Sequence, residues 1–233
     1  MVQLRDSLRE GRVTEKKREI LEAASRVFRR KGLHASGMLD IAAELDMAVG
    51  NLYYYFRDKE DLLAFIQQTT LAGLLRLAAR VEALDLRVDG KLWLLIAGHV
   101  ALLNETIPGS LAHLEVEALG EERRRPIQEG RDEYERTFRR LIAEGIASGV
   151  FRTSDPKVAE LAILGAANWS VKWFRPDGGK TACEIGKEMA DLLVRGLLPP
   201  GDSADGFASP SLDLLAALTE PEPLSGNLSG KMS

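Results

Sequence analysis

The chain has 233 residues, of which 45% are hydrophobic, and a formal net charge of −4. This length allows a small domain together with a larger one, and the hydrophobic fraction is sufficient for a core. The single cysteine excludes an internal disulfide framework, the charged N-terminus is unlike a signal peptide, and the longest apolar run, residues 92–103, is too short to cross a bilayer. We therefore expect a cytoplasmic protein without a membrane partner.

The charge is unevenly distributed along the chain. Residues 1–60 contain 12 Lys and Arg against 10 Asp and Glu, so this part carries +2 and the remainder −6. A positive N-terminal part of this size indicates a modest capacity for phosphate contact. The alternative is that the first residues form a solvated, flexible basic arm.

Three helical stretches come first in the chain. Thr14 can cap a helix whose apolar residues return at helical spacing until Gly32. Ser36 can cap a second, short helix, which must stop near Asp46, because Asp tolerates a left-handed turn. A third helix over residues 48–56 carries amide and tyrosine side chains on the face away from its apolar residues. Two helices joined by a tight turn predict a helix-turn-helix that enters a DNA major groove.

The remaining chain also reads as helix. Asp58 begins a long helix that continues beyond the small domain and would act as a connector. The last two long helices are expected over 155–174, after an Asp-Pro start, and 181–198, after a Thr–Glu capping box. No segment alternates with period two, so the fold class is all-α.

These patterns divide the chain into four expected parts. The composition changes to Gly, Ser, Pro and Asp after residue 200, which is typical of disorder, with a transient helix over Leu212–Leu218 as the alternative. The expected parts are a flexible basic arm over 1–13, a helix-turn-helix domain over 14–57, a helical ligand-binding and dimerisation domain over 58–200, and a disordered tail over 201–233.

The search for catalytic chemistry finds nothing positive. The three histidines lie on separate elements without metal-ligand spacing, and neither a phosphate-binding glycine loop nor a nucleophile elbow is present. Cys183 lies in the first turn of a helix, where its pKa could be lowered, but a lone cysteine there is more often a small packed residue. We expect no enzyme activity, no cofactor and no metal site.

The N-terminal part resembles the DNA-binding domain of the TetR family of bacterial repressors. The residues that carry this resemblance are Ile20–Ala24, Phe28, Lys31-Gly32, Asp40–Ala42, Gly50, Leu52–Tyr54, Phe56, Lys59 and Leu62-Leu63. The resemblance implies that the first helix of the motif faces phosphate, that its second helix reads bases, and that the next helix begins with a phosphate contact. The implied DNA-binding residues are Ser36, Gly37, Ala48, Val49, Gly50, Asn51, Tyr53, Tyr54 and Lys59.

The chain departs from the family pattern at several of these positions. It has Asp46 where the family usually has Gly, and apolar Leu39, Ala48 and Val49 where polar residues are common. Asn51 and the tyrosines are then the main polar readers, and Asn pairs with adenine while small apolar groups touch thymine methyls. The operator would then be rich in A·T pairs at its contacted positions, or the affinity of the chain for the operator would be modest. We expect two of the three tyrosines to face DNA; the alternative is that one or more pack on the first helix.

The C-terminal half resembles TetR-family members that regulate fatty-acid or steroid breakdown and tend to sense acyl-CoA thioesters. Residues 168–176 and 192–197 carry this narrower resemblance. The candidate ligand-binding residues are His99, Tyr134, Trp169, Trp173 and Arg175. The alternatives are core or dimer packing for the two tryptophans and solvation for the arginine. The basic run over 123–125 is either a solvated face or a site for the polyanion CoA.

Taken together, the sequence and the resemblance predict a homodimeric repressor that a lipophilic effector, an acyl-CoA above all, releases from a palindromic double-stranded DNA operator. The dimer would form a four-helix bundle through 155–174 and 181–198. Two alternatives stay open. One is an activator or corepressor-type regulator of the same fold, and the other is a helical interaction module that has lost DNA binding.

Overall fold

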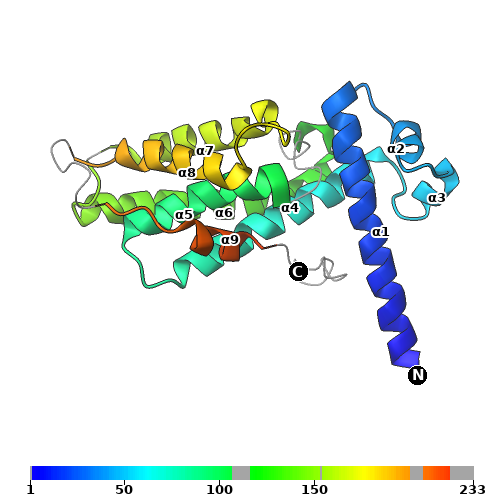
Figure 1. The fold of residues 1–233 in the computed structure, drawn as a ribbon, viewed down its shortest axis with the longest axis horizontal. Coiled ribbons are helices and arrows are strands. Elements are labelled where there is room, and N and C mark those ends of the chain that lie inside the picture. Colours follow the sequence, from blue (N-terminus) through cyan, green and yellow to red (C-terminus); the bar gives the residue numbers. More distant parts are fainter. Residues whose placement is uncertain (1, 107–115, 153, 200–206, 221–233) are drawn as a thin grey trace. The chain divides into compact units, whose positions relative to one another are not determined.

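The computed structural model describes residues 2–106, 116–152, 154–199 and 207–220. These residues form helices and connections without a strand, so the predicted all-α class is confirmed (Figure 1). The helices are α1 (Val2–Lys31), α2 (Met38–Glu44), α3 (Val49–Tyr53), α4 (Lys59–Glu82), α5 (Val88–Ala101), a π-helical turn (Leu102–Thr106), a 3₁₀ turn (Val116–Ala118), α6 (Glu121–Ala147), α7 (Pro156–Trp173), α8 (Ala182–Arg195) and α9 (Leu212–Thr219).

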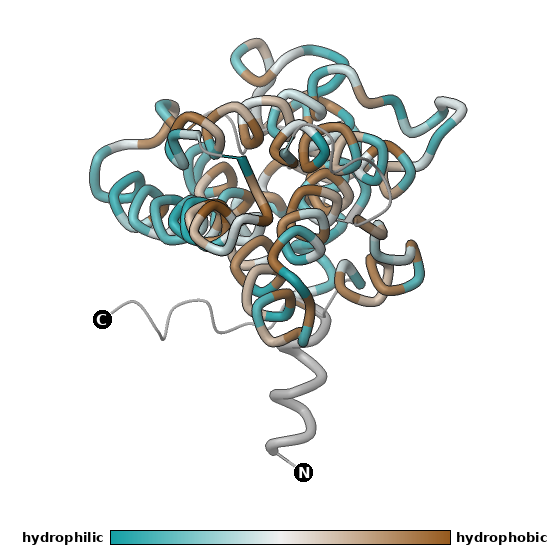
Figure 2. Tube along the Cα trace, turned by 90° about the vertical axis from the view of Figure 1, so that its left-hand side faces the viewer, coloured by the Kyte–Doolittle hydropathy of each residue, from teal (hydrophilic) through white to brown (hydrophobic). Residues whose placement is uncertain are grey.

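The described residues belong to two compact units. Residues 2–70 and 116–127 form unit 1, and residues 71–106 and 128–220 form unit 2. Helices α4 and α6 therefore contribute residues to both units. Hydrophobic and hydrophilic residues take different sides of the helices in Figure 2, as amphipathic helices require.

The core of unit 1 comes from one face of each of its helices. Val27 and Phe28 of α1, Ile41 of α2, Leu52 of α3 and Ile66 of α4 are all buried together. Burial of such side chains stabilises the unit by roughly 1.5–3 kcal/mol each. This small core holds α2 and α3 against α1 and fixes the outward face of α3.

The turn between α2 and α3 has the geometry that the sequence predicts. Asp46 has φ 51°, in the left-handed region, and the N–H of Met47 donates to the carbonyl of Ala42 at 3.0 Å. Gly32, with φ 82°, ends the regular part of α1 in the same way. Both helix ends therefore follow from residues that tolerate positive φ.

Two helix starts in unit 1 differ from the expectation. α1 begins at Val2 and not at Thr14, so residues 2–13, expected as a flexible arm, are helical; Leu, Arg and Glu in this stretch are good helix formers. Gly37, and not Ser36, is the N-cap residue of α2. Its N–H donates to the Asp40 carboxylate at 2.8 Å, which satisfies a helix-end donor without the serine.

Unit 2 is organised around α5. All of its residues except Lys91 are buried, as the long apolar run predicts. α8 lies directly against it, because a Cβ on Gly186 would lie 2.6 Å from the carbonyl oxygen of Ala97. The indole N–H of Trp93 on α5 also donates to Asp191 on α8 at 2.7 Å.

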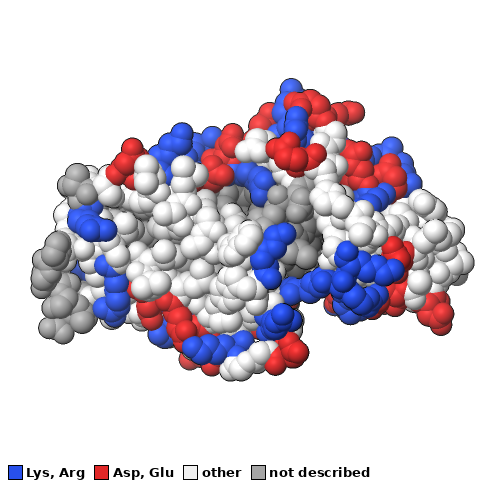
Figure 3. Space-filling view, turned by 90° about the horizontal axis from the view of Figure 1, so that it is seen from above, with Lys and Arg blue, Asp and Glu red and all other residues white. Residues whose placement is uncertain are grey.

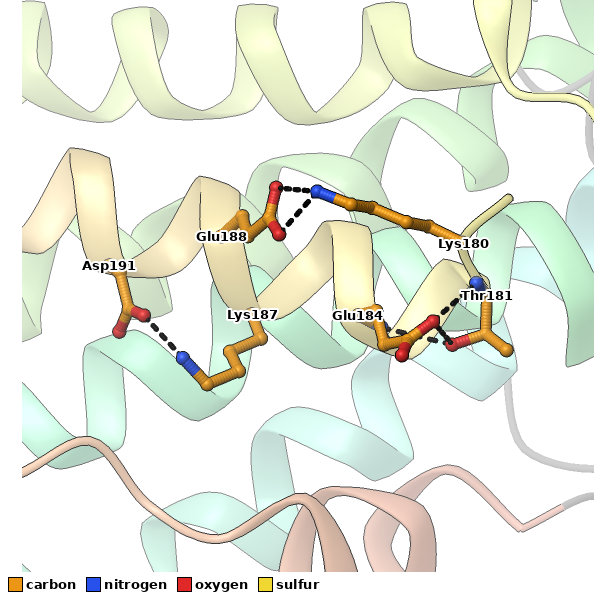
Figure 4. A network of polar contacts seen from close by, with 6 residues as sticks. All are labelled: Lys180, Thr181, Glu184, Lys187, Glu188 and Asp191. Carbon is orange, nitrogen blue, oxygen red and sulfur yellow. Dashed lines mark hydrogen bonds and ion pairs between the residues drawn. The ribbon is translucent and has the colours of Figure 1, made fainter. Parts of the chain in front are cut away.

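The two predicted caps in unit 2 are confirmed. Asp155 accepts hydrogen bonds from the first amides of α7, at 2.8 and 3.2 Å. Thr181 and Glu184 form the reciprocal capping box at the start of α8, which Figure 4 shows beside the Lys180–Glu188 and Lys187–Asp191 ion pairs. Such caps are worth about 1 kcal/mol each.

Part of the expected disordered tail is folded. Residues 207–220 contain α9, which Ser211 caps and which contacts α5 and α8. Phe207 and Leu215 are buried, and the Ser209 hydroxyl donates to Asp191 at 2.5 Å. The prediction was wrong for this segment because its short apolar run finds a docking face in unit 2; residues 201–206 and 221–233 lie outside the described residues.

By length and composition, α4 is the one helix among the described residues that could cross a membrane. Its most apolar window is 67% buried inside the protein. A core helix has this property, so α4 needs no lipid to cover it.

Leu215→Ala tests whether α9 belongs to the folded unit. Leu215 is fully buried, so we expect the free energy of unfolding to fall by about 2 kcal/mol or more. The matched control is Leu212→Ala on the same helix, where the side chain is 39% exposed and the loss should be much smaller. Urea unfolding followed by circular dichroism measures both, and equal small losses would show that α9 does not contribute.

Candidate DNA-binding and effector sites

The exposed face of α3 presents most of the predicted base-reading residues. Asn51 is exposed, Tyr53 is 48% exposed and Tyr54 is 67% exposed, whereas Leu52 between them is buried. The third tyrosine, Tyr55, is half-buried, and its ring meets that of Tyr54 edge to face at 5.1 Å. Two of the three tyrosines thus point away from the core, as the exposed Asn51 does.

The start of this face contains small side chains. Ala48 is the exposed N-cap residue of α3, Val49 is half-buried, and Gly50 is exposed, with open space where a Cβ would stand. A surface built from such small groups allows close approach of a flat partner. Base edges and thymine methyls in a major groove are partners of this kind.

The two residues expected to face phosphate from the α1–α2 loop are turned inward. Ser36 is 5% exposed, and its hydroxyl donates to the carbonyl of Leu33 at 2.9 Å. The N–H of Gly37 is already bonded to Asp40. Neither serine hydroxyl nor glycine amide is available to a phosphate in this arrangement, because both are used to build the loop.

Lys59 holds the same loop from the first turn of α4. Its ammonium donates to the carbonyls of Leu33 at 2.5 Å and Ser36 at 2.7 Å. Burial lowers the pKa of this lysine, and the charge of Asp40 opposes the effect. An ammonium has three N–H donors, so one stays available for a backbone phosphate.

The acidic residues of α2 are neutralised by α1. Glu44 accepts from Arg26 at 2.8 Å and from Arg30 at 2.9 Å, and these bonds lower its pKa. Lys31 bonds Asp40 at 2.5 Å and lowers the pKa of that carboxyl. Both carboxylates therefore stay ionised but paired, which limits their repulsion of a polyanion.

His99 and Tyr134, two predicted ligand residues, meet inside unit 2. The Nδ1 atom of His99 lies 3.2 Å from the Tyr134 hydroxyl, and its Nε2 atom lies 3.1 Å from the amide oxygen of Asn168. Burial lowers the pKa of His99 to about 4 and raises that of Tyr134. The Tyr134 hydroxyl then donates to Nδ1, and the protonated Nε2 donates to Asn168, so all three groups are neutral.

Trp169 and Trp173 do not join this pair. They are 61% and 47% exposed, on the outer face of α7. The expectation that they wall a cavity together with His99 and Tyr134 is therefore wrong, since spacing of four places both on one helix face but does not say which face. Asn168, which the sequence analysis missed, points inward instead; a polar residue within an apolar helix was the available signal.

Arg175 lies at the edge of a shallow surface pocket of about 350 Å³ in unit 2. Trp173 and Phe174 form its aromatic wall, and Lys180 and Ile185 also line it. Lys180 is already paired with Glu188 at 2.6 Å. The pocket thus combines aromatic surface with cationic groups, away from the His99–Tyr134 pair, whose side chains are buried.

The basic run over 123–125 is engaged within unit 1. Arg123 lies 3.5 Å from both Asp58 and Glu60, at the start of α4. Arg124 pairs with Glu117 at 2.8 Å. The Arg123 pairs tie the first turn of α6 to the start of α4, the Arg124 pair ties it to the 3₁₀ turn, and both favour a structural role over CoA binding.

Cys183 has an ordinary packed environment. It is half-buried, and burial together with the charges of Glu105 and Glu184 raises its pKa. A raised pKa reduces the thiolate fraction, so the reactive alternative loses support. Among the described residues no group of His, Cys, Asp and Glu could hold a metal ion.

Comparison with known proteins decides the family. Residues 20–66 match the family model of bacterial regulatory proteins, tetR family, and residues 85–197 match the tetracyclin repressor-like C-terminal domain. The crystal structure of the TetR family transcriptional regulator PfmR from Thermus thermophilus is 31% identical, with a TM-score of 0.69, over 77% of this chain and 99% of that chain. The chain belongs to the TetR family of bacterial regulators.

Two further relatives of this TetR-family chain are informative. The HTH-type transcriptional repressor KstR2 of Mycobacterium tuberculosis is 25% identical over 194 residues, 82% of this chain and 97% of the relative. The structure of AibR in complex with isovaleryl coenzyme A and operator DNA is 27% identical, with a TM-score of 0.66, over 79% of this chain and 98% of that chain. The predicted family and fold are thereby confirmed, and the family consists of DNA-binding regulators.

The buried neutral His99 predicts a specific pH dependence of stability. Unfolded histidine has a pKa near 6.5 and the buried ring one of about 4, so at intermediate pH only the unfolded chain binds the proton. The free energy of unfolding should therefore fall between pH 7 and pH 4, by up to about 3 kcal/mol from this residue. Glutamine does not titrate, so the free energy of unfolding of His99→Gln, measured in urea, should fall by that much less over the same pH range. If the free energies of unfolding of the two proteins changed equally with pH, the buried neutral state of His99 would be contradicted.

Proposed function

We propose that this chain is a homodimeric, cytoplasmic transcriptional repressor that binds a palindromic operator through α3 and is released by a lipophilic effector of the acyl-CoA class. The observation that carries the proposal is the exposed face of α3, where Asn51, Tyr53 and Tyr54 lie opposite the buried Leu52. A helix held by its apolar side with amide and phenol groups outside is suited to a major groove. The similarity to KstR2, a repressor, supports the direction of regulation.

The proposed contacts follow from the side chains on this face. The amide of Asn51 can pair bidentately with adenine, and Ala48 and Val49 can touch thymine methyls. The tyrosines supply further base or phosphate contacts, and the third N–H of Lys59 reaches a backbone phosphate. Ser36 and Gly37 act indirectly, by shaping the loop that Lys59 holds.

Asn51→Ala and Tyr54→Ala test this assignment. Loss of a bidentate base contact costs about 1–3 kcal/mol, so we expect operator affinity to fall at least about 10-fold for Asn51→Ala. Gel-shift titrations at fixed salt, with palindromic DNA from upstream of the protein's own gene, measure the change. Lys157→Ala, which removes an exposed charge from unit 2, is the control and should bind as the parent does. Unchanged affinity in both α3 variants would show that another surface reads the DNA.

The dimer is proposed from an exposed apolar face on α7 and α8. The surface of these helices in Figure 3 contains a broad region without charged side chains. Its large apolar side chains are between 47% and 74% exposed: Val158, Leu161, Trp169, Trp173 and Leu192. Gly165 lies on the exposed side of α7, where nothing fills the space next to it and a partner helix can approach closely. An uncovered patch of this kind marks an association surface.

A second copy is the occupant that fits this face. Two helices from each chain would form a four-helix bundle, and a symmetric dimer would present two copies of α3 to two half-sites of the operator. The two tryptophans are thereby assigned to the dimer face and not to the buried surroundings of His99 and Tyr134. This is the packing alternative that the sequence left open.

Leu192→Glu should dissociate the dimer, because a charge would replace the most exposed leucine of the face. Light scattering at micromolar concentration should report a monomer for this variant and a dimer for the parent chain. Leu86→Glu is the matched control, since Leu86 is also exposed but lies between α4 and α5, away from α7 and α8. A stable monomer of the parent chain would remove the dimer from the proposal.

The effector class is proposed from two supports. AibR, which resembles this chain over most of its length, was crystallised with isovaleryl coenzyme A and operator DNA. In unit 2 the His99–Tyr134–Asn168 chain places neutral polar groups within an apolar interior, as sites for mostly apolar ligands do. Arg175 and the shallow pocket beside it are available for a charged part of such a ligand.

The route from ligand to DNA would use the two helices that the units share. α4 and α6 each contribute residues to both units, and Arg123 pairs their first turns. A ligand that prefers one arrangement of unit 2 would shift the position of α4 and so the spacing of the two α3 helices. It can shift this equilibrium only by its differential affinity for the two states.

Fluorescence anisotropy with labelled operator tests the effector class. Isovaleryl-CoA and longer acyl-CoAs should raise the dissociation constant for the operator, whereas free CoA should not. By thermodynamic reciprocity, bound operator should weaken the acyl-CoA by the same factor. If neither acyl-CoAs nor free acids change operator affinity, the effector belongs to another class.

A further inference from the structure

Asn104 occupies an unusual position in unit 2. It lies in the π-helical turn Leu102–Thr106 that follows α5, and only 6% of it is exposed. Its neighbours Leu102 and Leu103 are buried as well. π-helical turns are rare and are frequent at functional sites, where they place a side chain that a regular helix would not.

The two N–H groups of the Asn104 amide are both used. Nδ2 donates to the carbonyl of Val100 at 2.8 Å and to the hydroxyl of Ser170 on α7 at 2.7 Å. This fixes the amide orientation, because the reversed amide would place its oxygen against the Val100 carbonyl, another acceptor. Asn104 Oδ1 therefore points the other way.

Asn104 Oδ1 is shielded from solvent, and no group among the described residues donates a hydrogen bond to it. A buried acceptor without a donor destabilises the fold, and most buried polar groups in proteins are satisfied. A polar side chain that lowers the stability of an apolar interior is expected to have a role other than stabilising the fold. The missing group must be a hydrogen-bond donor.

A second polar bridge joins α5 to α7 on the same stretch. His99 contacts Asn168, as Asn104 contacts Ser170, and both bridges are formed by uncharged groups. Arg131 on α6 is the cation whose charge acts on His99. The side chains that form the two bridges are thus neutral donors and acceptors.

We propose that Asn104 Oδ1 accepts a hydrogen bond from an uncharged hydroxyl group of an otherwise apolar ligand bound in unit 2. A carboxylate would place a negative oxygen against this acceptor, an ether or plain hydrocarbon would leave it unsatisfied, and an ammonium would lose its hydration for a single bond. The inference deepens the proposed function, on which it rests for the role of the ligand, by assigning a hydroxyl to the buried part of the effector.

Isothermal titration calorimetry of the full chain with three eight-carbon probes tests the proposal. Octan-1-ol supplies the donor, heptyl methyl ether is its isomer without an O–H, and octanoate is the charged analogue. Because a satisfied buried acceptor is worth about 1–3 kcal/mol, octan-1-ol should bind at least about 10-fold tighter than the ether. It should also bind tighter than octanoate.

Two variants locate the effect. Asn104→Leu keeps the side-chain volume and removes the acceptor, so the alcohol and the ether should bind equally. Ser170→Ala removes a partner of Nδ2 and leaves Oδ1 in place, so the preference for the alcohol should persist. Circular dichroism confirms the fold of each variant, and if Asn104→Leu does not fold, the three-probe comparison on the parent chain decides alone.

Three results would overturn the proposal. The first is equal binding of octan-1-ol and the ether, and the second is no binding of octan-1-ol. The third is tighter binding of octanoate than of octan-1-ol, which would indicate binding near Arg131. Operator affinity measured without any probe is independent of all three. An intact response to acyl-CoA without a preference for the alcohol would refute only this inference, and absent operator binding beside a clear preference would refute only the proposed function.

Discussion

The enclosure of α5 is the constraint on which unit 2 depends. Other helices can approach a helix that is buried on nearly all sides closely only where the side chains at the contact are small. Gly186 of α8 meets its backbone at Ala97, and Gly98 of α5 leaves room for the Leu77 side chain, which a Cβ there would approach to 2.7 Å. Every polar side chain on such a helix must also find its partner inside the protein. His99 and Trp93 do so through other helices, and each bond fixes one neighbour in place.

In unit 1 the corresponding constraint is the α1–α2 loop. Its carbonyl groups have no helical partner, and Lys59 supplies the donors from the next helix along the chain. The same lysine keeps one N–H donor beyond these two bonds. A structural role of Lys59 is therefore compatible with the proposed phosphate contact, because the bonds that fold the loop also hold the ammonium in place. The ion pairs of α1 with Glu44 and Asp40 complete a surface whose acids are paired.

Local chemistry made part of this structure predictable. The left-handed turn at Asp46 and the helix starts at Asp155 and Thr181 follow from single residues or short motifs, and the structure confirms them. Which face of α7 is exposed was not predictable. The Trp169–Trp173 spacing indicates that both side chains share one face of the helix, but not what covers that face. A stable helix at α9 was not predictable for a similar reason. Eight residues with a serine cap are too few to form a stable helix alone, and the contacts with α5 and α8 stabilise it. Tertiary contacts decided both.

The position of α9 bears on how the chain matures. Proteins are synthesised from the N-terminus, so the segment that packs against Asp191 and α5 leaves the ribosome after the helices that it contacts. Until then, the site that receives Leu215 stays open to water, and a chain cut short before Phe207 would display it permanently. The family match ends at residue 197, before this segment begins. The chain therefore completes this part of its core only after α5 and α8 have been synthesised.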